Sequence, residues 1–126
     1  MSENTYIEGV CNIGPAEIRQ RRIVGYVGLV LTGIYLGFAL SIDSSNLVRA
    51  GVFIPLYIAT TGWLQATKKF CLAYGFLGTY NFGRLGSTTR VENVEALRID
   101  RKVATSILLQ SALYAAGATL LTFLLY

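Results

Sequence analysis

The chain has 126 residues, of which 53% are hydrophobic and only 14% are charged. A soluble domain of this length has too small a core to bury so much apolar surface, so the composition excludes an ordinary soluble protein. The net charge of +4 comes from basic residues beside apolar stretches, which indicates membrane edges and excludes nucleic acid as the partner.

The N-terminal segment leads into the first apolar stretch. Residues 9–14 read as a compact turn, and Pro15 suits the first position of a helix because its fixed φ is already helical. The helix predicted over Pro15–Arg22 either lies on the membrane surface or extends the first span. Two of its basic residues are the expected anchors at the membrane interface: Arg19 and Arg22.

Residues Ile23–Ile42 form the first predicted membrane-spanning helix, because they carry no charge and match the ~20 residues that cross a hydrocarbon core. The run is too long for a signal peptide and no cleavage site follows it, so we expect no cleavage. Its glycines let another helix approach closely, either another span or a second subunit, although glycines are also simply frequent in membrane helices. They are Gly25, Gly28, Gly33 and Gly37.

A short polar segment, Asp43–Arg49, connects the first span to the second, which is predicted over Ala50–Thr67. With so short a connection, the two spans must form an antiparallel hairpin. Pro55 removes a backbone hydrogen bond and is expected to bend the second span. Gly62 and Ala66 lie on a small-residue face that is expected to meet the first span. The predicted anchors at the inner end are Trp63, Lys68 and Lys69.

Residues 68–102 are predicted to form a cytoplasmic segment at the membrane interface. The part from Phe70 to Gly86 is aromatic but too rich in glycine for a spanning helix, so a re-entrant or interfacial turn fits it best, with Tyr74 at the level of the headgroups. Residues Thr89–Glu92 match a capping box, which predicts a helix that begins there and continues into the third span.

The third predicted span covers Val103–Tyr126, which again carries no charge. Its small pairs are Ser111 with Ala115 and Ala112 with Ala116, and both suit close helix packing. The predicted fold is therefore an all-α membrane protein with three transmembrane helices, an antiparallel hairpin plus a third span, in a single domain over residues 1–126.

The basic residues orient these spans. Of the 11 Lys and Arg residues, three precede Ile23 and seven lie between Lys68 and Lys102, while Arg49 alone lies between the first two spans. Cytoplasmic flanks collect Lys and Arg, so the N-terminus is predicted to be cytoplasmic and Tyr126 to lie outside. We expect a multi-pass protein of the plasma membrane, in bacteria the inner membrane.

Few residues offer chemistry. The chain has no histidine, which excludes imidazole ligation of haem or zinc, and we expect no metal and no cofactor. No charged residue lies inside a span, which argues against a proton or ion pathway. Cys11 and Cys71 are the candidates for a thiol site, with Lys68 and Lys69 favouring the thiolate of Cys71. The alternative is that both cysteines are small, semi-buried hydrophobic residues.

Two motifs, Cys11-Asn12-Ile13-Gly14 and the segment Phe70–Gly78, resemble the YgaP-like transmembrane domain family, a two-helix membrane hairpin found alone or attached to membrane rhodaneses. The resemblance covers roughly residues 11–83. Leu72 replaces the family's proline, and the third span lies outside the pattern. The positions that fit the family are Asn12, Gly14, Arg19, Arg22, Gly25, Gly28, Gly62, Cys71, Tyr74 and Gly78. The resemblance implies a hairpin scaffold.

The expected function is that of a small non-catalytic membrane subunit, a structural or accessory component of a larger or homo-oligomeric assembly. Its expected partners are the lipid bilayer and other membrane helices. The expectation depends on the lack of catalytic motifs together with an excess of small-residue packing faces. The alternative, which the link of the resembled family to rhodaneses implies, is a component that handles thiols or sulfur through Cys11 and Cys71.

Overall fold

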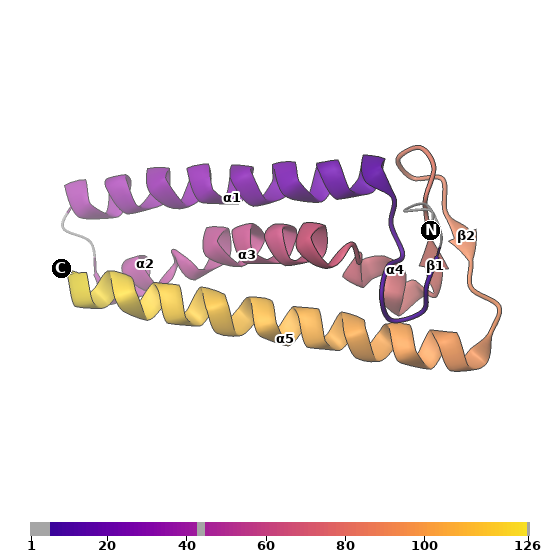
Figure 1. Cartoon of the computed structure of the whole chain (residues 1–126). Helices are drawn as coiled ribbons and strands as arrows, with labels where there is room; N and C mark the ends of the chain where they lie inside the picture. Colours follow the sequence, from indigo (N-terminus) through magenta and orange to yellow (C-terminus); the bar gives the residue numbers. More distant parts are fainter. Residues whose placement is uncertain (1–5, 43–44, 126) are drawn as a thin grey trace.

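In the computed structural model, which describes residues 6–42 and 45–125, three long helices lie side by side (Figure 1). Three segments are long and apolar enough to cross a membrane, which confirms the three predicted membrane helices. The long helices are α1 (Pro15–Ser41), α3 (Phe53–Lys68) and α5 (Val94–Leu125). The shorter elements are α2 (Asn46–Ala50), α4 (Leu72–Leu77), β1 (Thr79–Tyr80) and β2 (Thr89–Arg90).

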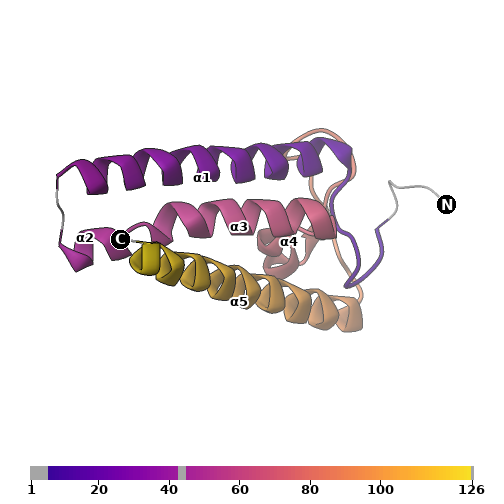
Figure 2. The ribbon, with the colours of Figure 1, turned by 60° about the vertical axis from the view of Figure 1, so that its left-hand side comes forward.

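The three long helices form a layer and not a closed bundle. Helix α3 packs against both α1 and α5 and lies between them, as two views of the ribbon show (Figures 1 and 2). Helices α1 and α3 run antiparallel, as the hairpin prediction requires. Large apolar side chains of all three helices therefore remain exposed on the outside of the layer.

Helix α1 is continuous from Pro15, which occupies the start of the helix where its missing N–H is not needed. Of the two alternatives for Pro15–Arg22, the segment is thus an extension of the first span. The polar end of the molecule, as we call it, is the end where α1 and α5 begin and α3 ends (Figure 1).

The second span begins with a separate short helix. The Ser45 side chain caps α2 by accepting a hydrogen bond from the Val48 backbone N–H, and the chain then turns at Gly51 before α3 begins. Pro55 lies in the first turn of α3, where proline is tolerated. The break therefore precedes the predicted bend at Pro55.

Helices α1 and α3 approach most closely at their glycines. A Cβ atom on Gly28 would lie 2.4 Å from the Ala59 backbone nitrogen, and one on Gly62 would lie 2.6 Å from the Gly25 nitrogen. Such backbone contact requires residues without side chains, as in membrane helix pairs generally. Helix α5 packs on the other side of α3, where Phe70, Ala104 and Ile107 form a small buried core.

The described chain is mostly helical, as the predicted fold class requires, but the segment between α3 and α5 also contains a short strand pair. Strands β1 and β2 pair in antiparallel fashion, with Thr79 opposite Arg90 and Tyr80 opposite Thr89. The predicted capping box is wrong for the same reason, because Thr89 and Arg90 are held in the strand pair. The Asn93 side chain instead caps α5 by accepting hydrogen bonds from the backbone N–H groups of Glu95 and Ala96.

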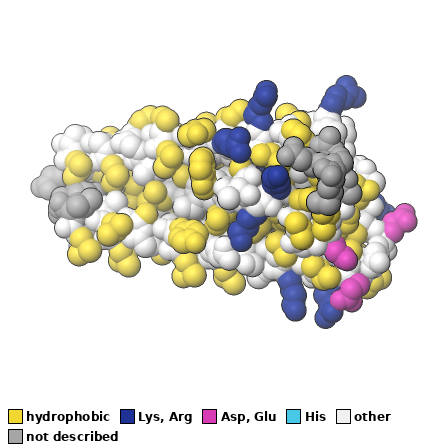
Figure 3. All heavy atoms as spheres, viewed as in Figure 1, with side chains coloured by type: hydrophobic (Ala, Val, Ile, Leu, Met, Phe, Trp, Pro, Cys, Tyr) yellow, Lys and Arg dark blue, Asp and Glu magenta, His cyan; other side chains and the backbone are white. Residues whose placement is uncertain are grey.

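Helix α5 continues without a break from Val94 to Leu125 and so contains the described part of the third predicted span; Tyr126 lies outside the described residues. On the face seen in Figure 3, the basic side chains lie in the half of the molecule toward the polar end, and in the other half the coloured side chains are hydrophobic. The distribution is that of a chain whose middle lies in lipid and whose polar end lies at the headgroups.

Candidate functional site

A cluster of hydrogen-bonded side chains fills the polar end between α1, α3 and α4. We refer to it as the polar cluster, and its members are Asn12, Glu17, Arg21, Cys71, Tyr74 and Asn81. It joins segments that lie about 50 to 70 residues apart, as its hydrogen bonds show. These contacts fix the N-terminal segment and the α4 segment to the beginning of α1.

Asn12 connects the N-terminal segment to the beginning of α4. Its side-chain oxygen accepts a hydrogen bond from the Cys71 backbone N–H at 2.7 Å, and its Nδ2 donates to the Cys71 carbonyl at 3.1 Å. Its backbone N–H donates to the Lys69 carbonyl, and its carbonyl accepts from Asn81. Asn12 is fully buried, so these bonds replace all contact with water.

Glu17 lies at the centre of the cluster, and only 1% of its surface is exposed. Its Oε2 accepts hydrogen bonds from the Tyr74 hydroxyl at 2.7 Å, Asn81 Nδ2 at 2.9 Å and the Gly86 N–H at 3.1 Å. Its Oε1 pairs with Arg21 at 3.1 Å. An ionised carboxylate has about four acceptor positions. Glu17 thus has four donors from the protein, three on Oε2 and one on Oε1, which suits a structural carboxylate better than a general base.

Arg21 links this carboxylate to a thiol. Its Nη2 donates to Cys71 Sγ at 3.0 Å, and its guanidinium lies 5.8 Å from the centre of the Tyr74 ring. Burial and the hydrogen bond to Glu17 together raise the pKa of Tyr74 to about 12. The Tyr74 hydroxyl thus stays protonated as a donor at neutral pH.

The two predicted thiol residues lie in segments that the fold brings together, since Asn12 follows Cys11 directly and binds both backbone groups of Cys71. Cys71 is buried and Cys11 is half-buried, and neither forms a disulfide among the described residues. The cation beside Cys71 is Arg21, whereas the sequence pointed to Lys68 and Lys69, both of which are exposed.

A second buried carboxylate, Asp100 of α5, holds the N-terminal segment from the other side. Its Oδ1 accepts a hydrogen bond from the Gly9 N–H at 2.7 Å, and its Oδ2 accepts one from the Tyr6 hydroxyl. Burial and this hydrogen bond raise the pKa of Tyr6. Asp100 therefore ties α5 to the same N-terminal segment that Asn12 ties to α4.

The predicted packing residues divide into two groups. Gly25, Gly28 and Gly62 are buried where α1 and α3 meet, and Ala66 is also buried. By contrast, Gly33 and Gly37 are exposed, and a Cβ atom on either would meet nothing within 4 Å. In α5 the buried small pair is Ser111 with Ala115, while Ala112 is half-buried and Ala116 is exposed.

The predicted interface anchors are also of two kinds. Arg19, Arg22, Lys68 and Lys69 are exposed at the polar end, and Trp63 is 47% exposed with its ring edge-on to Tyr26. Tyr74, in contrast, is a member of the polar cluster. Its ring is held by Glu17 and Arg21, so a bilayer is not needed to position it.

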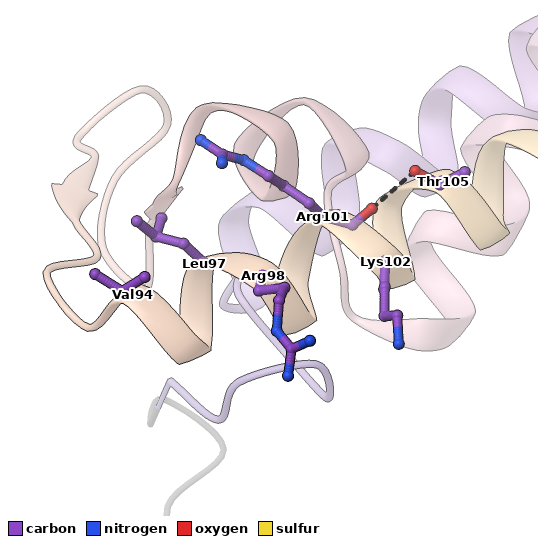
Figure 4. Close-up of a pocket in the computed structure, with 6 residues that line it drawn as sticks. All are labelled: Val94, Leu97, Arg98, Arg101, Lys102 and Thr105. Atoms are coloured by element: carbon purple, nitrogen blue, oxygen red, sulfur yellow. Dashed lines mark hydrogen bonds between the residues drawn. The ribbon is translucent and has the colours of Figure 1, made fainter.

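A shallow pocket lies on the first turns of α5 (Figure 4). Its basic side chains diverge, because Arg101 points to the opposite side of the helix from Arg98 and Lys102. Arg98 is paired with Glu95, and Arg101 Nε donates to the Phe76 carbonyl. The three positive charges therefore do not converge on a common ligand.

Sequence reasoning missed the roles of Glu17, Asn81 and Asp100. By its place in the sequence, Glu17 is only an acid in the first turn of a predicted helix, where it favours the helix dipole. The available signal was its isolation, since it is the single acid between Gly9 and Ile42. Its partners, however, are set by the tertiary fold.

Within residues 6–42 and 45–125, no group of three or more His, Cys, Asp or Glu side chains could hold a metal ion. No family model matches the chain, and neither a curated protein nor a solved structure matches it. The resemblance to the YgaP-like hairpin family accordingly stays a prediction.

Proposed function

We propose that this protein is a small non-catalytic subunit of a membrane assembly, in which it packs against other membrane helices. The observation that carries this proposal is the contrast between two pairs of glycines in α1. Gly25 and Gly28 serve the contact with α3. By contrast, Gly33 and Gly37 are spaced four residues apart, and a Cβ atom on either would meet nothing within 4 Å in the described chain.

A helix face that meets only lipid does not need paired glycines, because flexible acyl chains can pack against side chains of any size. Glycines four residues apart on one face instead allow a second helix to approach closely. The exposed Gly33–Gly37 face of α1 is therefore the surface on which we place the partner, either a second copy or a different protein.

The polar cluster supports the non-catalytic part of the proposal. Its central carboxylate is almost fully buried and has four donors from the protein, three of them on Oε2. The buried side-chain amide of Asn12 likewise forms its hydrogen bonds with the backbone of Cys71. Such a satisfied network stabilises one arrangement of segments and is not poised for proton transfer.

We place the polar end in the cytoplasm and the C-terminus outside. Ten of the 11 basic residues flank the spans at or near the polar end, and Lys and Arg flank membrane helices on the cytoplasmic side. The membrane that fits this orientation is the plasma membrane, which in bacteria is the inner membrane.

The test is the mass of the protein extracted from its native membrane with a mild detergent. The lone chain has a mass of 13.8 kDa, so native mass spectrometry separates it from any assembly. We expect a larger, stoichiometric species. Recovery of the chain as a stable monomer in every preparation would contradict the proposal.

A second candidate function is thiol or sulfur handling at Cys71. The observation in its favour is the Arg21 guanidinium at 3.0 Å from the sulfur, because reactive cysteines lie beside cations. The burial of Cys71 argues against it. Alkylation of each cysteine against pH, in native membranes, decides between the two. Ordinary titration and normal behaviour of a Cys11→Ala/Cys71→Ala variant would leave the structural role alone.

A further inference from the structure

A polar pocket of about 320 Å³ opens beside the first two turns of α1. Its walls come from two elements. Four residues at positions i, i+3, i+4 and i+7 of α1 share one helix face, and the fifth comes from the end of α3. The lining residues are Pro15, Ile18, Arg19, Arg22 and Lys69.

All three charged residues of this pocket are basic. No ion pair or hydrogen bond engages the side chains of Arg19, Arg22 or Lys69 within residues 6–42 and 45–125, and none of the lining residues is acidic. The pocket on α5 differs in this respect, since two of its three basic side chains already have partners in the protein. Three unneutralised positive charges around one hollow attract a multivalent anion.

Lys69 is held at the pocket by its backbone. It ends α3 in a left-handed conformation with φ 56°, which is unfavourable for a residue other than glycine. The Asn12 N–H donates to its carbonyl at 3.1 Å, so the polar cluster fixes the turn that carries the lysine. The lysine is therefore presented from a defined turn and not from a loose loop.

A separate apolar groove lies next along α1, and it begins at Ile23, the residue after Arg22 of the pocket. After Arg19 in the sequence, Ile23, Val27 and Leu31 follow along α1 at four-residue intervals. These three residues line the groove together with Tyr26 and Val30. Ile23 and Val27 are about half exposed, at 52% and 48%. The change from basic to apolar surface takes place within one helical turn. A phospholipid makes the same change between its phosphate and its acyl chains.

We propose that Arg19, Arg22 and Lys69 bind the phosphate of an anionic phospholipid, with an acyl chain along the Ile23–Leu31 groove of α1. The inference does not depend on the proposed subunit function, because a lone chain would carry the same pocket. It assigns a specific lipid site to residues that sequence analysis treated only as general interface anchors.

The experiment compares the binding of phosphatidylglycerol and phosphatidylcholine to the full chain, delipidated in a neutral detergent, by native mass spectrometry. Removing one basic residue near a headgroup is expected to weaken binding about fivefold. Arg19→Gln and Lys69→Gln should each weaken phosphatidylglycerol binding by that factor, whereas Lys69→Arg should preserve it. The matched control is Lys68→Gln, which removes the same charge from the adjacent residue outside the pocket.

The control should bind phosphatidylglycerol like the unchanged chain, and phosphatidylcholine should bind more weakly than phosphatidylglycerol to both. Helix content, measured by circular dichroism, should be the same in all variants, since the altered side chains are exposed. Equal losses of phosphatidylglycerol binding in Lys68→Gln and Lys69→Gln would overturn the proposal, because they would show that the lipid responds to general surface charge and not to the pocket. Equal affinity for the two lipids would overturn it as well. Displacement of the lipid by equimolar inorganic phosphate would assign the pocket to free phosphate instead.

Discussion

The side chain of Asn12 forms hydrogen bonds with both backbone groups of Cys71, at 2.7 Å to its N–H and 3.1 Å to its carbonyl. This pair joins two residues that are 59 positions apart in the chain, and the first two predicted spans lie between them. These hydrogen bonds stabilise the α1–α3 hairpin at the polar end, and the glycine contacts stabilise it within the apolar part.

Replacing Asn12 by Ala should destabilise the fold by about 1–3 kcal/mol, because it leaves the buried backbone N–H of Cys71 without its acceptor, while the Cys71 carbonyl keeps its bond from the Gly75 N–H. Unfolding in detergent, followed by circular dichroism as a denaturing detergent is added, measures the loss. Asn46→Ala is the matched control, since Asn46 is exposed in α2. Equal stability of the two variants would mean that the Asn12 bonds contribute nothing.

Two glycines of the same helix should respond in opposite ways to a methyl group. Gly28→Ala places a Cβ atom 2.4 Å from the Ala59 nitrogen and should force α1 and α3 apart, at a cost of about 1–3 kcal/mol. Gly33→Ala meets open space and should stabilise the isolated chain by roughly 0.5–1 kcal/mol, because alanine favours a helix. The same unfolding assay compares them. Similar destabilisation by both substitutions would contradict the assigned α1–α3 interface.

In the folded protein, the Tyr74 hydroxyl should ionise at a higher pH than in the unfolded chain. The pKa of this hydroxyl is raised from 10.0 to about 12, first by burial and then by the hydrogen bond to Glu17. Between these pH values the unfolded chain has lost the proton that the folded chain retains. The contribution of Tyr74 to stability is therefore complete below pH 10 and is lost as the pH rises through about 12.

The chain has eight tyrosines, so the ultraviolet titration of Tyr74 is obtained as the difference between the unchanged protein and Tyr74→Phe. Glu17→Gln removes the acceptor charge and should move the midpoint toward 10. A difference titration centred near pH 10 in the folded, unchanged protein would show that Tyr74 does not donate to Glu17.

The orientation of the spans can be read with reporter fusions after Ser2, Ser45, Ser87 and Tyr126. The basic residues on both sides of the hairpin predict a cytoplasmic signal from Ser2 and Ser87 and an outside signal from Ser45 and Tyr126. A cytoplasmic Ser45 fusion or an outside Ser87 fusion would refute the three-span topology.

Much of the apolar part could be predicted from the sequence because its rules are local. Uncharged stretches of sufficient length define the spans, and glycine spacing indicates where helices can meet. The sequence could not tell which glycines serve which contact. Gly28 and Gly33 look alike in the chain, and only the placement of α3 separates them.

The polar end was less predictable because its contacts are long-range. Glu17 accepts hydrogen bonds from Tyr74, Asn81 and Gly86, which are 57 to 69 residues away. The capping-box prediction failed where two local signals competed. Strand pairing took Thr89 and Arg90, and Asn93 then capped α5 a few residues later.

The central claim is that the Gly33–Gly37 face of α1 contacts another membrane helix. The most direct measurement places a photo-crosslinking amino acid at Leu40, which is 52% exposed and lies three residues after Gly37 on the same face. Illumination of intact membranes should yield one discrete protein adduct, and the Gly33→Ile/Gly37→Ile variant should abolish it. Adducts with lipid alone, in a chain without the isoleucine substitutions, would contradict the claim.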